Sequence, residues 1–468
     1  MERGRSAAFA ALILWLALGM GRLSGGEEME TVLFDFKGDF DVHAVEVERV
    51  NASLASLFVP RPAGLNAGLP WGKKIADGAD HRLRLEIAAA GAYPSAVLRA
   101  PRGSWDLSAR RYLKWDLSNP GPQPVAVSCW AFAPGGWGGV GSYPLAEPKG
   151  WYTLQAGARV TAEIDLHQRF PGGMTKQTDP SHVTLLHVVL MGQVGARVEV
   201  GRIRATGEGL PADDASLRLR VPDMTVGTPA PGLRVRQRLP EYQATDVFHA
   251  LYLPTDWKPG GRYPVIVEYP GNIFYDRYCY STGRTEYSTM GYGMSRGVGC
   301  IWLNLPFISA DHKRNEVDGW GDADATADYC IKAVKDVCGR YGGDPGAVVF
   351  TGFSRGGIAC GYIGLRNDAI AGVWLAFHPN QGFDGQDWHG STLADACVRA
   401  ARIKGRAVFL TDSGWGEKVL KPAGIAYESG SAKLGAHADT AFLEDRQVTR
   451  ECRAWLARVL RDRPGARR

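Results

Sequence analysis

A serine between two glycines at residues 352–356 has the residue types and spacing for covalent chemistry. Gly352-Phe353-Ser354-Arg355-Gly356 follows four apolar or β-branched residues that predict a buried strand, and it precedes small and apolar residues that can begin a helix. At so tight a turn we expect glycines on both sides of the serine, because a Cβ there would collide with the neighbouring strand and helix. The turn exposes the hydroxyl beside the first N–H groups of the helix, which can stabilise an oxyanion. We therefore predict that Ser354 is a nucleophile.

The residues around this serine narrow its interpretation. The alternatives are a glycine-rich turn without catalytic function and a phosphate-binding loop, and the second is disfavoured because no Gly-Lys-Ser/Thr accompanies the glycines. Asp344-Pro345 introduces the predicted strand, and the run from Tyr341 to Gly357 resembles the nucleophile elbow of the α/β-hydrolase superfamily. The resemblance implies a triad in the order serine, acid, histidine along the chain.

A serine nucleophile needs a base within reach of its proton. Of the ten histidines only His378, His389 and His437 follow Ser354. His378 follows a predicted strand, and His389 falls in a loop. His437 lies in a small-residue loop before the last predicted helix, which is where the superfamily keeps its base. We therefore predict His437 as the base; the alternative is a surface loop histidine.

The base in turn needs a carboxylate that holds its tautomer. The predicted strand Arg406 to Leu410 is followed by Asp412 and Glu417 in one loop. A carboxylate in this loop can accept the Nδ1–H of the imidazole. We predict Asp412 as the acid with Glu417 as its rival, while Asp384 and Asp387 after the preceding strand are weaker candidates. Each of these carboxylates can instead be a solvated loop residue.

The oxyanion of an acyl-transfer reaction needs two backbone donors. Tyr263 to Asn272 predicts a buried strand that ends in a glycine turn, and it resembles the third strand and oxyanion loop of α/β hydrolases, with Pro-Gly where His-Gly often stands. The resemblance implies one donor at the N–H of Asn272 or Ile273. The second would be the N–H of Arg355, directly after the nucleophile.

Composition indicates a globular protein of more than one domain. The chain has 468 residues, 45% of them hydrophobic and 22% charged, which suits two domains. A net charge of +5 without a strong basic block gives no reason to expect nucleic acid. The eight cysteines show no disulfide framework, and no metal-binding spacing occurs. We expect no metal and no cofactor.

The N-terminus predicts export. Arg3 and Arg5 precede an apolar run from Ala7 to Met20, and small residues and an acidic pair follow. This is the pattern of a secretory signal peptide over residues 1–26, and the run is too short to span a bilayer as a helix. We expect a secreted or periplasmic protein without a stable membrane anchor. The alternative is a disordered or core-packed N-terminus.

Residues 28–208 have the punctuation of an all-β domain. Strand-like runs lie between Pro- and Gly-rich turns and predict a sandwich or jelly roll; they are 31–36, 81–87, 112–117, 125–132, 160–166, 182–191 and 197–205. Ser104 to Ser108, Tyr112 to Pro120 and Val198 to Ile203 resemble jelly-roll carbohydrate-binding modules of secreted polysaccharide-degrading enzymes. The aromatic residues that could stack on a sugar, or instead fill the core, are Trp130, Trp137, Tyr143, Trp151 and Tyr152.

Residues 209–230 read as a linker, and residues 231–468 as the α/β-hydrolase domain. An antiparallel pair, Leu233 to Leu239 and Thr245 to Leu253, opens this domain. Alternating strands and helices then predict a mostly parallel sheet covered on both faces. The predicted elements are strands at 263–272, 299–305, 348–351, 371–377 and 406–410, and helices at 324–339 and 447–460.

Together these resemblances imply a secreted serine hydrolase, foremost a carboxylesterase that removes acetyl or feruloyl groups from polysaccharide or acts on a small ester. Four alternatives remain: a peptidase of the prolyl-oligopeptidase type, a lipase or polyester depolymerase, a glucuronoyl esterase, and a non-catalytic glycan-binding protein. Glucuronoyl esterases share Ser-Arg at the elbow, but this chain has Phe353 before the serine and lacks that family's lysine after the arginine.

Overall fold

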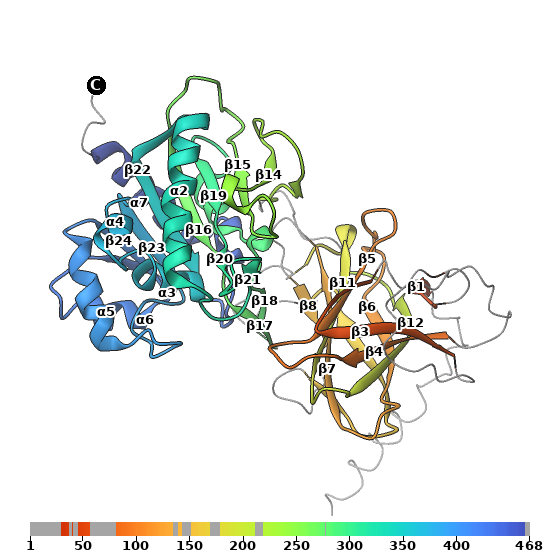
Figure 1. Ribbon diagram of the computed structural model, residues 1–468. Helices are drawn as coiled ribbons and strands as arrows, with labels where there is room; N and C mark the ends of the chain where they lie inside the picture. Colours follow the sequence, from red (N-terminus) through yellow and green to blue (C-terminus); the bar gives the residue numbers. More distant parts are fainter. Residues whose placement is uncertain are drawn as a thin grey trace, which may run out of the picture.

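The computed structural model describes residues 30–36, 40, 45–56, 81–133, 139–142, 151–168, 178–210, 219–276 and 278–463. The predicted signal peptide lies outside these residues, as do Trp137 and Tyr143. Among the helices in the described ranges, none is both long and apolar enough to cross a membrane. Figure 1 shows an all-β body in orange and yellow beside an α/β body in green and blue, in the order that the sequence predicts.

The N-terminal body is a sandwich of two antiparallel six-stranded sheets. One sheet has the order β10-β6-β12-β4-β3 with β1 paired to β12, and the other has the order β2-β5-β11-β7-β8 with β9 paired to β7. The strands are β1 Thr31–Phe34, β2 Val45–Glu48, β3 Val50–Ser56, β4 His81–Ile87, β5 Ser95–Arg99, β6 Tyr112–Ser118, β7 Val125–Phe132, β8 Gly139–Gly141, β9 Tyr152–Leu154, β10 Arg159–Asp165, β11 Leu185–Met191 and β12 Arg197–Thr206.

Side-chain alternation explains which strands the sequence predicted well. In β4 every second residue is buried, and Leu83 and Leu85 enter the core between the sheets. β7 has the predicted bounds at both ends. The strands that the sequence did not predict include β2, β3 and β5, which are short or rich in polar and small residues.

The C-terminal body is built on a mixed nine-stranded sheet of order β13-β14-β15-β19-β16-β22-β23-β24-β25. The predicted opening pair, β14 and β15, is antiparallel, and the sheet is parallel from β19 to β25. β13 lies within the segment predicted as linker. The strands are β13 Met224–Thr225, β14 Arg234–Gln237, β15 His249–Tyr252, β16 Tyr263–Tyr269, β19 Ile301–Asn304, β22 Gly343–Phe353, β23 Ala376–Asn380, β24 Ala407–Thr411 and β25 Glu428–Gly430, with the hairpins β17 Ile273–Asp276 and β18 Cys279–Thr282, and β20 Phe307–Ile308 and β21 Asn315–Glu316.

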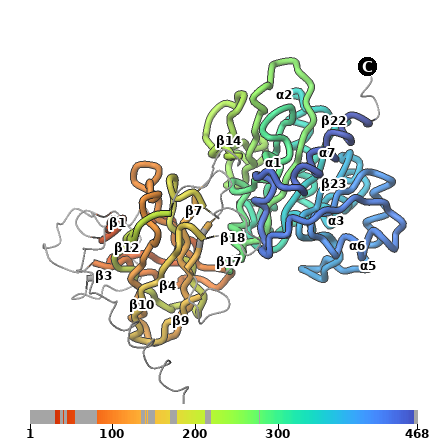
Figure 2. Tube along the Cα trace, turned by 180° about the vertical axis from the view of Figure 1, so that it is seen from behind, coloured from red at the N-terminus to blue at the C-terminus, as the bar shows by residue number. Residues whose placement is uncertain are grey.

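Helices cover both faces of this sheet, as predicted. The helices are α1 Met290–Ser295, α2 Ala323–Tyr341, α3 Arg355–Tyr362, α4 Asp368–Ala371, α5 Leu393–Ala400, α6 Gly414–Leu420 and α7 Gln447–Asp462. Residues of α2, α3 and α5 share one core with the sheet, and α1 and α7 share the other. Figure 1 shows α2 in front of the sheet, and Figure 2 shows α1 and α7 from behind.

Three parallel strands end in one row at the same edge of the sheet. Phe353 of β22 pairs with Asn380 of β23, and Asn380 pairs with Thr411 of β24. The residues that directly follow these three strand ends are Ser354, Gln381 and Asp412. The fold therefore brings the predicted nucleophile and the predicted acid to one edge, with a residue that the sequence did not single out between them.

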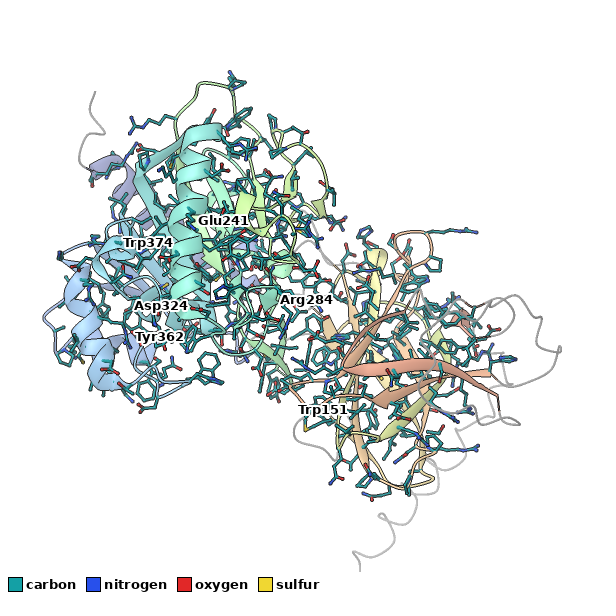
Figure 3. The ribbon with its side chains drawn as sticks, viewed as in Figure 1. Trp151, Glu241, Arg284, Asp324, Tyr362 and Trp374 are labelled. Atoms are coloured by element: carbon teal, nitrogen blue, oxygen red, sulfur yellow. The ribbon has the colours of Figure 1, made fainter. Side chains whose placement is uncertain are left out.

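The two bodies meet along an apolar, aromatic interface. The outward face of β7 and β11 packs against the β17–β18 hairpin, and Trp130 and Trp151 are buried there beside Ile273 and Tyr275. The Trp151 indole N–H donates to the Tyr275 carbonyl oxygen at 3.3 Å. Figure 3 labels Trp151 and Arg284 on the two sides of this junction.

This interface changes the interpretation of the aromatic residues proposed to stack on sugar. Trp130 and Trp151 are not exposed platforms, because the C-terminal body covers them. Tyr152 is half-buried against the sandwich core. Tyr275 and Tyr280 of the β17–β18 hairpin pack against Trp130 in the same contact.

Candidate active site

Ser354 stands at a sharp, strained turn. It joins β22 to α3 with φ +52° and ψ −112°, a conformation that L residues rarely adopt, and its N–H donates to Asn380 O at 2.9 Å. A Cβ on Gly352 would lie 2.4 Å from the Gly356 backbone, and one on Gly356 would lie 2.0 Å from Tyr269 O. The predicted reason for both glycines is confirmed, because neither position has room for a side chain.

Backbone strain is concentrated at this edge of the sheet. Gln381 has φ +50° and Asp412 has φ +47°, so all three residues that follow the row of strand ends are left-handed and none is glycine. Strained backbone persists where the surrounding structure enforces it, and such residues cluster at functional sites. The edge formed by Ser354, Gln381 and Asp412 is therefore the candidate active site.

The surroundings of the predicted oxyanion donors separate the candidates. The N–H of Ile273 donates to Val317 O at 2.9 Å, so of the two predicted candidates in the loop only Asn272 retains an N–H without an acceptor among the described residues. The Asn272 side chain is anchored, since its Nδ2 donates to Asp318 Oδ1 at 2.8 Å. The N–H of Arg355 is at the first position of α3, where a helix has no internal acceptor.

The side chain of Arg355 has a structural role that the sequence did not reveal. It is 1% exposed, and its guanidinium donates to the carbonyl oxygens of Gly271 at 3.0 Å, Gly283 at 3.0 Å and Gly319 at 2.8 Å. The guanidinium carbon, Cζ, lies 4.0 Å from the centroid of the Phe307 ring. Burial lowers the pKa of Arg355 to about 9, and the nearby carboxylates of the 316–318 segment oppose this shift.

The contact with Gly271 sets the direction of the peptide plane that carries the N–H of Asn272, one of the two predicted oxyanion donors. A trans peptide is planar, so its C=O and its N–H point in opposite directions. Because Arg355 holds the Gly271 carbonyl from below, the Asn272 N–H of the same peptide faces away from the buried guanidinium. Arg355 thus fixes the orientation of the Gly271–Asn272 peptide, whose N–H is a predicted oxyanion donor.

We expect Arg355→Met to lower kcat on a small ester about 10- to 100-fold with little change in KM, because one misdirected donor weakens only the transition state. It also leaves buried carbonyl oxygens unpaired, at about 1–3 kcal/mol each. Arg406→Met is the matched control: Arg406 donates to backbone carbonyls of Trp374 and Arg402, away from this loop. It should lower thermal stability and keep kcat. Equal losses of kcat in both variants would contradict the positioning role.

The structure brings the loop of His437 to the predicted nucleophile elbow. The imidazole packs on the ring of Phe353, the residue before Ser354, with centroids 4.6 Å apart. The backbone N–H of His437 donates to Tyr278 O in the β17–β18 turn at 3.0 Å. Burial lowers the pKa of His437 to about 4, so the imidazole is neutral at pH 7 and able to accept a proton.

Gln381 holds this loop, and the sequence analysis missed it. Its Nε2 donates to Ala436 O at 2.9 Å, and its Oε1 accepts from the Ala438 N–H at 2.9 Å, so both neighbours of His437 are fixed. The only signal in the sequence is the position of Gln381 directly after a strand. The sequence analysis predicted the end of that strand at Phe377, whereas β23 ends at Asn380.

We expect Gln381→Leu to lower kcat at least tenfold, because the imidazole loses its fixed distance to the serine. Gln381→Glu keeps the acceptor for the Ala438 N–H and should retain an intermediate rate. Steady-state kinetics on p-nitrophenyl acetate measure both. If the two variants differ from the parent only in thermal stability, Gln381 does not position the base.

Asp412 binds the segment that leads into the His437 loop. Its carboxylate accepts from the Ser431 hydroxyl and, at 2.8 Å, from the Ala432 N–H. No hydrogen bond between the side chains of Ser354, His437 and Asp412 is recorded within the described residues. Neighbouring strands lie about 4.8 Å apart, so Asp412 is roughly 10 Å from the serine strand and reaches it only through an intervening group.

The weaker candidates have other environments. Asp384 is buried and paired with Arg399, with Nε to Oδ2 at 2.6 Å. Glu417 on α6 and Asp387 in a loop are exposed, as Asp412 is, but within the described residues neither carboxylate binds the segment before His437 as Asp412 does.

His378 is not after a strand but inside β23, and this corrects the predicted end at Phe377. Its ring nitrogens make hydrogen bonds with the hydroxyls of Thr351 at 2.9 Å and Thr411 at 3.0 Å. Because these bonds pair the buried imidazole, the strand can continue through a polar residue.

Comparisons with known proteins give only distant likenesses. No family model matches the chain, and no curated protein matches it. Among solved structures, a thermostable esterase is 12% identical over 80% of this chain and 95% of its own, with a TM-score of 0.34. A putative dipeptidyl aminopeptidase IV from Bacteroides ovatus is 14% identical over 47% of this chain and 35% of its own, with a TM-score of 0.33. A family 11 carbohydrate-binding module from Clostridium thermocellum is 15% identical over 38% of this chain and 96% of its own, with a TM-score of 0.24.

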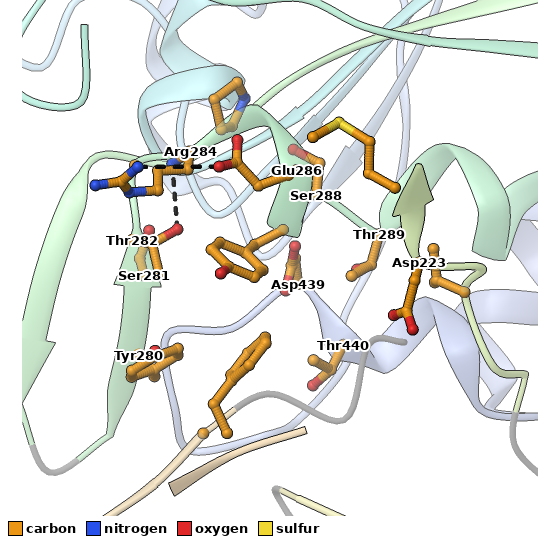
Figure 4. A pocket seen from close by; sticks show the side chains of 18 of the residues that line it. Asp223, Tyr280, Ser281, Thr282, Arg284, Glu286, Ser288, Thr289, Asp439 and Thr440 are labelled. Atoms are coloured by element: carbon orange, nitrogen blue, oxygen red, sulfur yellow. Dashed lines mark hydrogen bonds and ion pairs between the residues drawn. The ribbon is translucent and has the colours of Figure 1, made fainter. Parts of the chain in front are cut away.

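A cavity of about 380 Å³ adjoins the candidate site. Its lining includes Phe353, Gly271 and Ala438, which are the sequence neighbours of Ser354, Asn272 and His437. Figure 4 shows Tyr280, Ser281 and Thr282 on one side of the space, and Asp223, Thr289 and Thr440 on the other.

Proposed function

We propose that this protein is a serine hydrolase, and specifically a carboxylesterase that removes acetyl or feruloyl groups from polysaccharide. The observation that carries the proposal is the strained serine between two glycines, at a sheet edge where a neutral imidazole lies against the residue beside it. In this setting the serine nucleophile, the base and the oxyanion donors lie within one small region.

In the proposed reaction Ser354 Oγ attacks the ester carbonyl carbon while His437 takes the hydroxyl proton. The N–H groups of Asn272 and Arg355 bind the oxyanion. The bond to the alcohol breaks, and the alcohol leaves with the proton from His437. Water then attacks the acyl-enzyme; its proton passes to His437 and returns to Ser354 as the acid departs. Asp412 is the carboxylate that we propose orients His437. The proposed reaction uses no metal or cofactor.

The polysaccharide substrate and the export of the chain are part of the proposal. They rest on the signal pattern at residues 1–26 and on the β-sandwich that accompanies the hydrolytic domain.

The structure bears on the alternatives unequally. A glucuronoyl esterase reading would use the arginine after the nucleophile, but the Arg355 guanidinium is buried and bonded to backbone carbonyl oxygens, so it has no free face for a uronate. A lipase reading is disfavoured by the hydroxyl and charged groups that line the cavity. A prolyl-oligopeptidase-type peptidase and a non-catalytic glycan-binding protein are the remaining outcomes of the test.

The test combines a substrate panel with covalent labelling. We expect turnover of p-nitrophenyl acetate and of acetylated xylan or a feruloyl ester, and none of peptide amides or p-nitrophenyl palmitate. A fluorophosphonate probe should modify Ser354, as peptide mass spectrometry would show. Turnover of amides but not of esters would favour the peptidase, and no labelling and no turnover would leave a binding protein.

A further inference from the structure

The cavity beside the candidate site is built by both bodies. Its lining residues from the sandwich are Arg99, Gly103, Phe132, Gly139, Thr184 and Leu185. The opposite wall comes from β18, the segment before α1, and the loop after His437. Its volume of about 380 Å³ is in the range of small-molecule sites, which is about 300–1,000 Å³.

Several hydroxyl groups of the lining residues have no hydrogen-bond partner. Ser288, Thr289 and Thr440 are at least nine-tenths buried, and each has a side-chain oxygen without a partner within the described part of the chain. Native proteins pair nearly all buried polar groups, so hydroxyls in the wall of a cavity that have no partner within the described part of the protein can pair with a ligand that enters it. Figure 4 shows Thr289 and Thr440 on the same side of the space.

The charges around the cavity favour a neutral ligand. Four arginines line the cavity. Arg99 is paired with Glu46 at 3.0 Å, and Arg284 is paired with Glu48 at 3.0 Å. The guanidinium of Arg234 donates to the carbonyl oxygens of Glu286 and Thr285, and that of Arg236 lies 3.9 Å from the centroid of the Phe248 ring, so all four have partners within the protein. Carboxylates of Asp223 and other lining residues add negative charge. Hydroxyls and carboxylates with aromatic rings between them are the groups that bind sugar hydroxyls and stack on the apolar face of a pyranose.

The outward face of the sandwich offers less to a sugar. Its aromatic residues on β7 and β11 are covered by the β17–β18 hairpin, and Phe132 stacks on Tyr280 with ring centroids 5.2 Å apart. Phe132 lines the cavity at the rim of this contact. Phe132 of β7 and Leu185 of β11 line the cavity, so this sheet of the sandwich reaches the cavity beside the candidate site.

We propose that the cavity is the carbohydrate site of this protein: it binds a neutral pyranose of the glycan whose ester is cleaved, and the sandwich supplies one wall. This inference rests on the proposed function and specifies where its glycan substrate binds. The sandwich is then a part of the active site, whereas an appended module would bind sugar on its own.

The test measures sugar binding without catalysis, in the full chain carrying Ser354→Ala. Calorimetric titration uses neutral tetra- to hexasaccharides of xylan, mixed-linked glucan, mannan and agarose. We expect at least one to bind, and we expect Thr289→Val combined with Thr440→Val to weaken it tenfold or more. Without sugar the same pair should keep or raise Tm, because it removes unpaired buried hydroxyls. On the sandwich side, Arg99→Ala should weaken binding at least threefold.

Two controls accompany these variants. Thr449→Val removes a buried hydroxyl that donates to Ala441 O at 2.9 Å, and it should lower Tm while sugar affinity stays the same. Arg202→Ala removes a similarly exposed arginine from the other sheet, and sugar affinity should not change. The proposal is overturned if no oligosaccharide binds, if the paired variant leaves affinity unchanged, or if Arg99→Ala has no effect. Binding that is lost in the cavity variants supports it even if the parent protein cleaves no ester, so failure of the proposed function is seen separately.

Discussion

Replacing Ser354 with alanine should reduce hydrolysis of p-nitrophenyl acetate by about 10⁴-fold or more, because a missing nucleophile leaves only the binding groups and the oxyanion donors. Ser354→Gly should be equally inactive. The two variants separate chemistry from strain, since neither has a hydroxyl and only alanine has a Cβ.

Their stabilities should differ in a direction set by the backbone. At φ +52° and ψ −112° a Cβ is strained by about 1–3 kcal/mol, whereas glycine adopts this conformation freely and loses about 0.5–1 kcal/mol of unfolded-state entropy. We therefore expect Ser354→Gly to be about 1 kcal/mol more stable than Ser354→Ala, as urea unfolding would measure. Residual activity above a hundredth of the parent in both variants would rule out Ser354 as the nucleophile.

Replacing His437 with glutamine should lower kcat by about 10³-fold or more, because the glutamine amide cannot take the serine proton. The ring packs on Phe353 and no hydrogen bond of its side chain is recorded within the described residues, so the folded state should survive the change. His389→Gln is the control: His389 is an exposed loop histidine and should have the kcat of the parent. A parent-like kcat for His437→Gln would move the base elsewhere.

The pH profile of the parent tests what surrounds the imidazole. Burial holds the pKa of His437 at about 4, so the neutral form prevails at higher pH. We expect kcat/KM to be level above about pH 5 and to fall as the pH drops through about 4, because protonation removes the base. A carboxylate that pairs with the ring would raise this pKa. A midpoint near 7 would therefore show that the ring loses its burial or gains a carboxylate partner, such as Asp412, during turnover.

Local patterns account for what was predicted well. The glycines at 352 and 356 follow from the steric demands of one turn, and β7 follows from alternation along one strand. α2 begins at the cap of Asp322 and ends at left-handed Gly342, both of which are signals within a few residues. Each of these depends on neighbours along the chain.

Local patterns along the chain were enough to predict the serine turn, the order of an all-β and an α/β body, and His437 as the candidate base. Three features required the folded chain: Gln381 holds the His437 loop, Arg355 is turned inward against the Gly271 carbonyl, and the aromatic face of the sandwich is an interface. These contacts join residues far apart in the chain, and their geometry depends on strand register and domain docking. Residue types alone carry no record of either, because a buried arginine, a loop-bridging glutamine and an interfacial tryptophan look the same in sequence as exposed ones.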